Sequence, residues 1–504
     1  MALSDTTAAN NPAVLDVLIV GAGISGIGAA VHLQQHCPGH SFRILEARST
    51  LGGTWDLFRY PGVRSDSDMH TLGFSFRPWT GEKAIAAGAD ILDYLRETVA
   101  EHGLGPRISY QTRVLSAHWR SETGLWTVQV EAGDSGALGH FQCRFLHVCS
   151  GYYRYDQGHC PEFAGAADFA GRIVHPQHWP QDLALAGKQV VIIGSGATAV
   201  TLVPALANQG AQVTMLQRSP TYMVSRPSRD AAADWLRRHL GAGLAYRLTR
   251  WKNVLLGMAF FQATRRWPDR IARYLIADVQ GRTGPGVDIS HFTPRYKPWD
   301  QRLCLVPDAD LFKAMRRGQA RVVTDEIERF TPAGIRLKSG QELPADLIVT
   351  ATGLELLALG GIQFEVDGKP VPVGKTVGYR GMMLAGLPNL ACVAGYINAS
   401  WTLRADLTSR YLCRLLQHMR RRHWDYCTPV LDDARVQPRP WMDLSSGYIQ
   451  RAVSRFPQQG NRSPWQMETN YLREMLILRL CRLEDGSLRF GRASTPAGAT
   501  ERTT

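Results

Sequence analysis

The sequence lacks closely spaced cysteine pairs. Its nine cysteines are scattered along the chain, and none belongs to a C-x-x-C motif. The absence argues against a redox-active dithiol, and unpaired thiols are typical of proteins kept in a reducing cytoplasm. We therefore expect a cytoplasmic protein, and we expect no metal site.

Long apolar runs are also scarce. No apolar leader of the secretory kind precedes the first strand-like segment. Residues 381–403 carry no charge, but Pro388, Asn389, Gly395 and Asn398 interrupt them. A membrane-spanning helix needs about 20 mainly apolar residues in sequence. We interpret 381–403 as strand and turn.

Acidic residues are fewer than basic ones, 44 against 57, which gives a formal net charge of +13. Such an excess can indicate nucleic-acid binding. Here much of it falls in one stretch of helical character, residues 226–290, among interleaved apolar residues such as Trp251, Val254 and Leu255. The basic residues of this stretch include Arg237, Arg238, Arg247, Arg250, Lys252, Arg265, Arg266, Arg270 and Arg273.

Two interpretations of this stretch stay open. One is a helical insertion whose apolar face packs on the core while its basic face is solvated. The other is peripheral contact with an anionic membrane surface, at the inner face of the cell membrane.

What the chain does contain is two dinucleotide-binding patterns. The apolar run Val17–Val20 is followed by Gly21, Gly23 and Gly26, as in a buried strand, a tight phosphate-binding turn and a closely packed helix. Glu46 ends the next apolar strand, where a carboxylate accepts hydrogen bonds from ribose hydroxyls. This unit suits FAD, or NAD.

The second pattern differs at the ribose-reading position. The apolar run 190–193 leads into the loop and helix start Gly194, Ser195, Gly196, Ala197, Thr198, Ala199 and Val200. The next strand ends in Arg218 and Ser219 instead of an acid. A guanidinium there suits a 2′-phosphate, so this unit favours NADP.

Two nucleotides held at once indicate electron transfer between a nicotinamide and a flavin. Without a C-x-x-C pair, a flavin disulfide reductase is disfavoured. We therefore predict an α/β fold with two Rossmann-like domains, for FAD and NADP, and a helical insertion. Expected boundaries are 13–155 and 356–490 for the FAD domain, 160–225 and 291–355 for the NADP domain, and 226–290 for the insertion. A polar leader (1–12), a hairpin turn near 130–140 and a polar tail from about Gly491 complete this organisation.

Two further segments resemble a known family. Residues 52–66 fit G-G-x-W-x-x-x-x-[FY]-P-G-x-x-x-D, and residues 169–180 fit F-x-G-x-x-x-H-x-x-x-W-P. Both resemble the fingerprints of Baeyer–Villiger monooxygenases. Flavin-containing monooxygenases and N-hydroxylases usually lack the Trp179-Pro180 ending and the acid at Asp66. The resemblance extends over nearly the whole chain, and segments 58–69, 175–180 and 299–307 are most similar to the ethionamide-activating subgroup.

This resemblance implies a reaction. NADPH reduces FAD, and the reduced flavin adds O2 to give a C4a-peroxyflavin, which attacks a ketone and leads to an ester or lactone. A fixed guanidinium would keep the peroxide anionic and stabilise the adduct. The family's catalytic arginine corresponds to Arg302, and Asp66 would hold it.

The resemblance also implies cofactor contacts. Arg64, Ser65 and Asp66 would contact the nicotinamide side, and Ser25 the pyrophosphate. Val114 would present its backbone to the adenine. The flavin ring and ribityl chain would lie along Thr54, Trp55, Asp56 and Leu57.

Some assignments are weighed against plainer ones. His175 is interpreted as part of the interdomain linker, coupling domain movement to cofactor state, with a general-base role as the alternative. Trp401 and Trp465 are expected in the core, with the substrate site as the alternative. Many family members have lysine before the catalytic arginine, but here Gln301 occupies that position, as in the ethionamide-activating subgroup. NADP preference then depends more on Arg218 and Ser219, and discrimination against NADH is expected to be weaker.

Three functions are compared. The first is Baeyer–Villiger oxidation of an apolar ketone, with S-oxidation of thioethers or thioamides. The second is N- or S-oxygenation without ketone activity. The third is non-catalytic binding of a nucleotide or nucleic acid. Asp66, Arg302 and Trp179-Pro180 favour the first, so we expect a small-molecule substrate and O2 as partners, and no nucleic acid.

Overall fold

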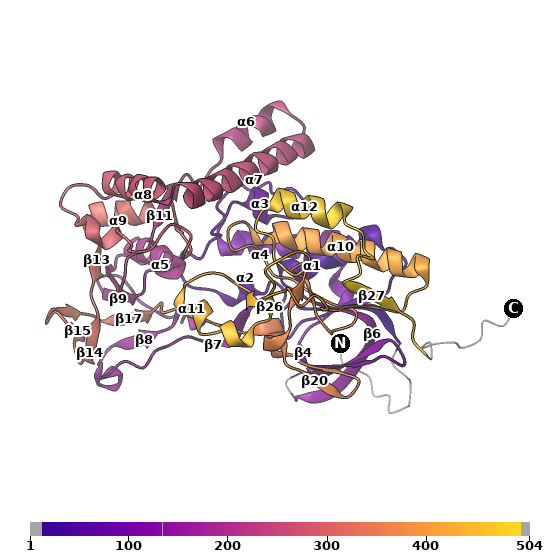
Figure 1. Ribbon diagram of the computed structural model, residues 1–504. Helices are drawn as coiled ribbons and strands as arrows, with labels where there is room; N and C mark the ends of the chain where they lie inside the picture. The colour runs from indigo at the N-terminus through magenta and orange to yellow at the C-terminus, as the bar shows by residue number, and fades with distance from the viewer. Residues whose placement is uncertain (1–12, 134, 495–504) are drawn as a thin grey trace.

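The computed structural model describes residues 13–133 and 135–494 (Figure 1). The leader expected at 1–12 lies outside the described residues, as do residues 495–504 of the tail. The tail begins later than expected, because Gly491 is the last residue of strand β27 (Leu488–Gly491), which pairs with β24 (Tyr426–Pro429).

The first unit is built on a nine-stranded sheet that combines two kinds of pairing. Its parallel part centres on β1, whose residues Val17, Leu18 and Ile19 are completely buried. Its antiparallel part consists of β4, β5 and β6, together with the pair β19 and β20. The expected hairpin is that of β5 and β6, apart from residue 134, which lies outside the described residues. In order, the strands are β20 (Lys369–Val371), β19 (Gln363–Val366), β4 (Thr112–Arg120), β5 (Leu125–Ala132), β6 (Ala137–Val148), β1 (Leu15–Val20), β2 (Phe42–Leu45) and β3 (Ile108–Ser109), and β23 (Leu390–Cys392) also pairs with β6.

Helices cover the parallel part of this sheet. Helix α1 (Ile24–His36) follows the first glycine loop and packs against the long helix α10 (Trp401–Arg422). Helix α4 (Gly88–Glu101) contributes Ile91, Leu92 and Leu95 to the same core. The shorter elements nearby are α2 (Thr54–Leu57), α3 (Met69–Leu72), β21 (Gly378–Tyr379), β22 (Met383–Leu384), β25 (Arg439–Pro440), α11 (Gly447–Gln450), β26 (Gln458–Gln459) and α12 (Tyr471–Leu480).

The second unit is a five-stranded, wholly parallel sheet. Helix α5 (Ala197–Ala207) follows its central strand, and α9 (Asp310–Arg316) packs against α5. The strands, in order, are β13 (Ala320–Thr324), β10 (Gln212–Gln217), β9 (Gln189–Ile193), β17 (Leu347–Thr350) and β8 (Arg172–Val174). A small antiparallel sheet of β14 (Ile327–Thr331), β15 (Gly334–Leu337) and β16 (Glu342–Pro344) lies at its end. Each unit thus has parallel strands with a strand–loop–helix start, which confirms the predicted α/β fold.

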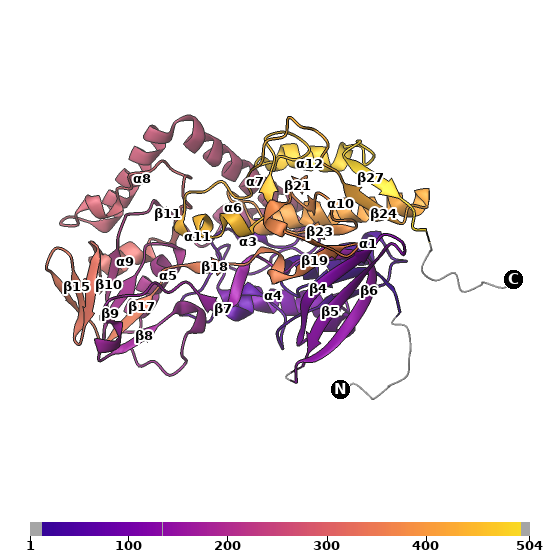
Figure 2. The ribbon, with the colours of Figure 1, turned by 60° about the horizontal axis from the view of Figure 1, so that its bottom comes forward.

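Two strand pairs connect the units. The outgoing strand β7 (Tyr153–Gly158) and the returning strand β18 (Leu354–Leu356) run antiparallel to one another. Figure 2 shows this pair between the two sheets. Strand β11 (Met223–Arg226) pairs in parallel with β12 (Cys304–Pro307), and the helical arm lies between them in sequence.

The helical insertion is present as an arm of three helices, α6 (Ala231–His239), α7 (Ala242–Arg266) and α8 (Pro268–Thr283) (Figure 1). The arm is anchored on the first unit by Arg250, whose Nη1 donates to the carbonyls of His70 and Gly73 at 2.8 Å each.

The uncharged stretch 381–403 is strand and turn, as expected, up to the first residues of α10. Within residues 13–133 and 135–494, no helix combines the length and the apolarity that crossing a bilayer requires.

Candidate active site

A cavity of about 1600 Å³ lies between the two units. Both glycine loops line it, together with the loop before β12 and one side of α7. The sequence elements that we expected to act together therefore meet around one space.

The first glycine loop leaves room for a phosphate group. Gly21 has φ +104°, and a Cβ there would lie 2.7 Å from the carbonyl oxygen of Cys149. Gly23 faces Gly53 across a gap that only backbone atoms border, while Gly26 packs against the carbonyl of Gly21 and does not line the cavity. The start of α1 is thus open to a pyrophosphate.

Glu46 ends β2 beside this loop. One carboxylate oxygen accepts from the backbone N–H of Ala22 at 2.8 Å, and the other accepts from that of Arg48 at 2.9 Å. Burial raises the pKa of Glu46, and these hydrogen bonds oppose the rise. The carboxylate lines the cavity, so its position suits ribose hydroxyls.

The second loop repeats this construction. The N–H of Gly194 donates to the carbonyl of Leu216, as that of Gly21 donates to Leu45. An added Cβ at Gly196 would meet no heavy atom within 4 Å, so the cradle is open. Arg218 and Ser219 lie exposed at the cavity edge, and Ser195, Ala197 and Thr198 line it as well, whereas Ala199 and Val200 are buried inside α5.

The long motif divides between cavity and support. Thr54 and Trp55 line the cavity, but Asp56 and Leu57 are not among its described walls. The buried carboxylate of Asp56 forms ion pairs with Arg48, at 2.6 Å, and with Arg59. Asp56 therefore fixes the loop.

The next residues also point in different directions. Arg64 lines the cavity and forms an ion pair with Asp310 at the start of α9. Ser65 is buried, and its hydroxyl accepts from the N–H of Ala86 at 3.2 Å. Asp66 lines the cavity beside Arg302, and Ser67 and Asp68 continue the wall.

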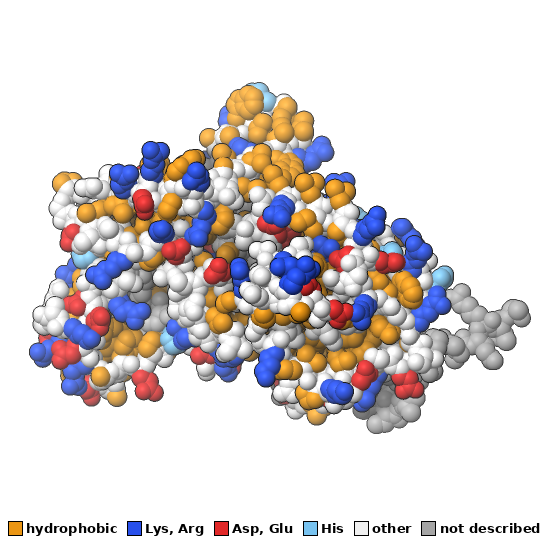
Figure 3. All heavy atoms as spheres, in the orientation of Figure 1, with side chains coloured by type: hydrophobic (Ala, Val, Ile, Leu, Met, Phe, Trp, Pro, Cys, Tyr) orange, Lys and Arg blue, Asp and Glu red, His pale blue; other side chains and the backbone are white. Residues whose placement is uncertain are grey.

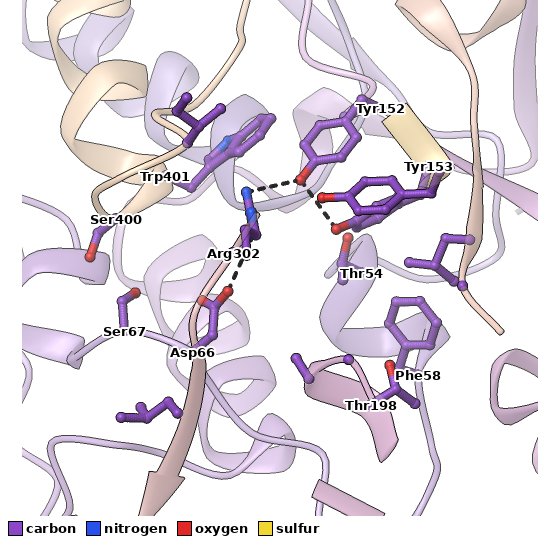
Figure 4. Close-up of a pocket in the computed structure, with 18 of the residues that line it drawn as sticks. Thr54, Phe58, Asp66, Ser67, Tyr152, Tyr153, Thr198, Arg302, Ser400 and Trp401 are labelled. Atoms are coloured by element: carbon purple, nitrogen blue, oxygen red, sulfur yellow. Dashed lines mark hydrogen bonds and ion pairs between the residues drawn. The ribbon is translucent and has the colours of Figure 1, made fainter. Parts of the chain in front are cut away.

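Arg302 lies between two partners, as Figure 4 shows. Its Nη1 is 3.4 Å from Asp66 Oδ2, and its Nη2 is 3.5 Å from the hydroxyl of Tyr152. Nε has no hydrogen-bond partner among the described residues, and 33% of the side chain is exposed, within the cavity. The neighbouring Tyr152 raises the pKa of Arg302 above its ordinary value, and Asp66 adds to this. The site thus holds a permanent cation with spare donor capacity.

The tyrosines around Arg302 were not anticipated. The hydroxyl of Tyr152 lies 3.1 Å from that of Tyr153, and its ring packs on Trp401. Burial raises the pKa of Tyr153 well above its ordinary value and that of Tyr448 to about 12. One signal was available: Tyr152 and Tyr153 follow the carboxyl end of β6, next to β1, where parallel sheets place ligand-binding residues.

The second fingerprint lies at the connection between the units. His175 Nε2 is 3.3 Å from the carbonyl of Gly353, and Nδ1 accepts from the N–H of Gln177 at 3.2 Å. The side-chain amide of Gln177 donates to the carbonyls of Arg154 and Tyr155 on β7. Burial lowers the pKa of His175. These residues hold β7 and β18 together.

Of the remaining candidate residues, some line the cavity and one lies in the core. Trp401 lines the cavity, and its Nε1 donates to the hydroxyl of Ser25 at 2.7 Å, which ties Ser25 to α10. Trp465 is buried against Tyr379 in the core. Val114 and Gln301 both line the cavity.

The residues of the two loops fit two dinucleotides. Each loop joins an open backbone cradle to a ribose-reading side chain, Glu46 in one unit and Arg218 in the other. Among the described residues, no group of three or more His, Cys, Asp or Glu side chains is placed to hold a metal ion.

Two segments of the chain match known protein families, and known proteins are similar to it over nearly its whole length. Residues 19–81 match the NAD(P)-binding Rossmann-like domains, and residues 84–235 match the flavin-binding monooxygenase-like family. The FAD-containing monooxygenase EthA of Mycobacterium tuberculosis is 52% identical over 96% of this chain and 99% of its own length. The probable FAD-binding monooxygenase AlmA of an Acinetobacter species is 47% identical over 94% of this chain and 96% of its own.

Solved structures share the fold. A steroid monooxygenase bound to NADP has a TM-score of 0.76 at 22% identity, covering 95% of this chain and 99% of that one. A polycyclic ketone monooxygenase from the fungus Thermothelomyces thermophila has a TM-score of 0.75 at 16% identity, covering 97% and 91%.

Proposed function

We propose that this chain, which belongs to the FAD-containing flavin monooxygenases, is a Baeyer–Villiger monooxygenase that converts a ketone to an ester or lactone. FAD and NADPH are its cofactors, and its substrates are a small molecule and O2. One oxygen atom enters between the carbonyl carbon and a neighbouring carbon, and the other leaves as water at the expense of NADPH. When bound, the reduced flavin supplies the activated oxygen.

The observation that carries this proposal is the position of Arg302. Attack on a ketone turns the carbonyl oxygen into an oxyanion, and a fixed guanidinium aimed at that oxygen stabilises the charge. Asp66 contacts one terminal nitrogen and the hydroxyl of Tyr152 the other. Nε has no hydrogen-bond partner in the described part of the chain, so the cation is positioned without being fully paired.

The cofactor loops would divide the nucleotides between them. The first loop and Glu46 would hold FAD, with Thr54 and Trp55 beside the flavin ring and Val114 near the adenine. The second loop would hold NADPH, with Arg218 and Ser219 at the 2′-phosphate. Arg64 and Asp66 lie where the two meet. Gln301 stands where many family members have lysine, which leaves Arg218 as the main reader of the phosphate.

S-oxidation of thioethers or thioamides is proposed as a second activity. A sulfur lone pair attacks the activated oxygen directly, so no carbonyl oxyanion forms and Arg302 has less to stabilise. An N- or S-oxygenating enzyme without ketone activity is the alternative. Arg302 favours the ketone reaction, because oxygenation of a heteroatom needs no oxyanion site.

Product analysis tests the proposal. FAD-loaded enzyme is supplied with NADPH, O2 and either a medium-chain methyl ketone or a matched thioether, and the products are identified by mass. Ester together with sulfoxide supports Baeyer–Villiger activity. Sulfoxide without ester, across several ketones, would move the enzyme to the heteroatom oxygenases and remove the carbonyl role from Arg302.

We also propose that this enzyme is cytoplasmic and makes peripheral contact with a membrane. The support is the composition of the arm, whose residues 231–283 include ten basic and three acidic side chains.

A further inference from the structure

Helix α7 exposes its more apolar side. Leu244, Leu248, Trp251 and Leu255 follow a spacing of four, three and four residues, which places them on one stripe of the helix. Each is between 39% and 49% exposed. A solvated helix normally presents polar residues on this side.

Other residues of α7 hold the helix on the protein, through buried apolar side chains such as Val254 and through polar contacts. Arg250 donates to backbone carbonyls of α3 and the turn after it. Asn253 donates to Asp68 at 2.9 Å, and Lys252 pairs with Asp230 at 2.7 Å. The outward position of the leucines and Trp251 is therefore fixed by the fold. Trp251 contacts the ring of Tyr471, and none of the four side chains of the stripe is buried.

The stripe belongs to a larger surface. Trp235 on α6 and Leu256 on α7 are 55% and 60% exposed. We call Trp235, Leu244, Leu248, Trp251, Leu255 and Leu256 the outer arm face. Figure 3 shows hydrophobic side chains gathered over the projecting α6–α7 part of the arm, with basic side chains at its borders.

Charge indicates what covers this face. The arm has many more basic than acidic residues, and two of the basic ones, Arg238 and Arg247, are exposed near the apolar stripe. Leucine and tryptophan bordered by arginine are typical of surfaces that enter the headgroup region of anionic bilayers. A second copy of this chain is disfavoured, because a symmetric contact would bring two basic faces together.

The outer arm face continues into the active-site cavity. Leu256 is mostly exposed yet lines the cavity, and the next turn of α7 contributes Gly257 and Phe260 to the wall. The same cavity contains Arg302. A molecule passing Leu256 would therefore enter the cavity that contains Arg302, along a wall to which α7 contributes Gly257 and Phe260 as well as the polar Asn253.

We propose that the outer arm face docks on an anionic lipid bilayer and that substrate enters the cavity from the bilayer past Leu256. The substrate class is then a long-chain, membrane-partitioned ketone or thioether. This inference rests on the proposed oxygenation, which it deepens by naming the source and size of the substrate.

Binding is tested first, with FAD-loaded enzyme and vesicles of phosphatidylcholine with or without phosphatidylglycerol. We expect sedimentation with the anionic vesicles only, weakened by salt. The variant Leu248→Glu/Trp251→Glu/Leu255→Glu should bind at least tenfold less. Leu138→Glu, at a 67% exposed leucine on β6, is the matched control and should bind as the wild type does. The proposal would be overturned if the wild type did not bind anionic vesicles. It would also be overturned if the wild type were a dimer and the triple variant a monomer.

Turnover is tested with two substrate lengths. Methyl pentadecyl ketone and methyl pentadecyl sulfide are embedded in the anionic vesicles, and methyl butyl ketone is supplied in water. The triple variant should lose at least tenfold on the embedded substrates and keep its rate on the soluble ketone. Equal loss on both would contradict entry from the bilayer. If sulfoxide forms with this vesicle dependence but no ester appears from either ketone, entry is supported and the Baeyer–Villiger assignment is overturned.

Discussion

Arg302 Nη1 lies 3.4 Å from Asp66 Oδ2, although 236 positions separate the two residues. Asp66 belongs to the long motif of the first unit, and Arg302 stands just before β12, which packs with the second unit. The ion pair therefore spans the boundary between the units, and any movement of one unit relative to the other changes the position of the guanidinium.

Replacing Arg302 should separate the two half-reactions. In Arg302→Ala we expect ester formation to fall by about a hundredfold or more, the usual effect of removing an oxyanion donor. NADPH should still reduce the flavin at nearly the wild-type rate, and hydrogen peroxide should replace ester. Stopped-flow reduction and product analysis measure the two steps. Arg435→Ala, at an exposed ion pair with Asp433, is the control. Equal loss of both steps would contradict the assigned role.

Tyr152 should affect how efficiently oxygen is used. Tyr152→Phe removes the hydroxyl next to Arg302 Nη2 but keeps the ring that packs on Trp401. We expect about a threefold lower ratio of ester to NADPH consumed, which corresponds to less than 1 kcal/mol. The KM for NADPH should not change. Tyr274→Phe, on the surface of α8, should leave the ratio unchanged, and a raised KM with normal coupling would assign Tyr152 to cofactor binding instead.

Local spacing was enough to predict the two nucleotide units, because each needs only a buried strand, a glycine turn and a side chain at the end of the next strand. Glu46 and Arg218 follow from that rule. The surroundings of Ser65 and Asp56 do not follow from it, since the sequence does not say which residues of a tight turn face inward. In the structure both are buried, Ser65 accepting a hydrogen bond from the N–H of Ala86 and Asp56 forming an ion pair with Arg48.

The partnership of Asp66 and Arg302 was reached through family resemblance, because no local rule joins residues so far apart. Tyr152 was missed for the same reason. The periodicity of apolar residues also did not show which side of α7 packs on the protein. Leucines occupy the exposed side, while the packed side includes hydrogen-bonding groups such as Arg250 and Asn253.

Nucleotide preference should depend on Arg218. A charged hydrogen bond to phosphate contributes about 1.5–3 kcal/mol, so Arg218→Ala should raise the KM for NADPH by roughly 10- to 100-fold. The KM for NADH should stay the same, because NADH has no 2′-phosphate. Conversely, Gln301→Lys should increase the preference for NADPH. Steady-state kinetics with both nucleotides measure the ratio, and a parallel rise in both KM values would place Arg218 outside the phosphate site.

The anchor of the arm should be sensitive to acid. Asp406 accepts a hydrogen bond from His32 at 2.8 Å and lies 3.6 Å from Arg250. Burial pushes the pKa of Asp406 upward, but the hydrogen bond and the charges of His32 and Arg250 outweigh it and lower the pKa to about 2.

Because the folded-state pKa lies below the ordinary value, this carboxylate stabilises the fold above about pH 4 and loses its effect as the pH falls towards 2. The shift corresponds to about 2 kcal/mol. Asp406→Asn should reduce the free energy of unfolding in urea by at least that amount at pH 7, and the difference from wild type should shrink below pH 4. The control Asp93→Asn, at an exposed ion pair on α4, should leave the free energy of unfolding unchanged. A difference that is independent of pH would show that Asp406 acts through packing alone.

His175 should behave as a hinge residue and not as a base. Both ring nitrogens are engaged, one with the carbonyl of Gly353 and the other with the N–H of Gln177, and the lowered pKa keeps the ring neutral at pH 7. No nitrogen is free to move a substrate proton. His175→Ala should therefore slow flavin reduction and ester formation together, by about tenfold, because both need the units correctly placed.

The pH profile separates the two roles of His175. A general base leaves a limb in the profile of kcat/KM that disappears with the residue. A hinge histidine leaves the shape of the profile above pH 6.5 intact and lowers the whole curve. His140→Ala, on the exposed part of β6, serves as the control. If His175→Ala removed a limb and spared flavin reduction, proton transfer would become its function, and the hydrogen bond to Gly353 would have to break during turnover.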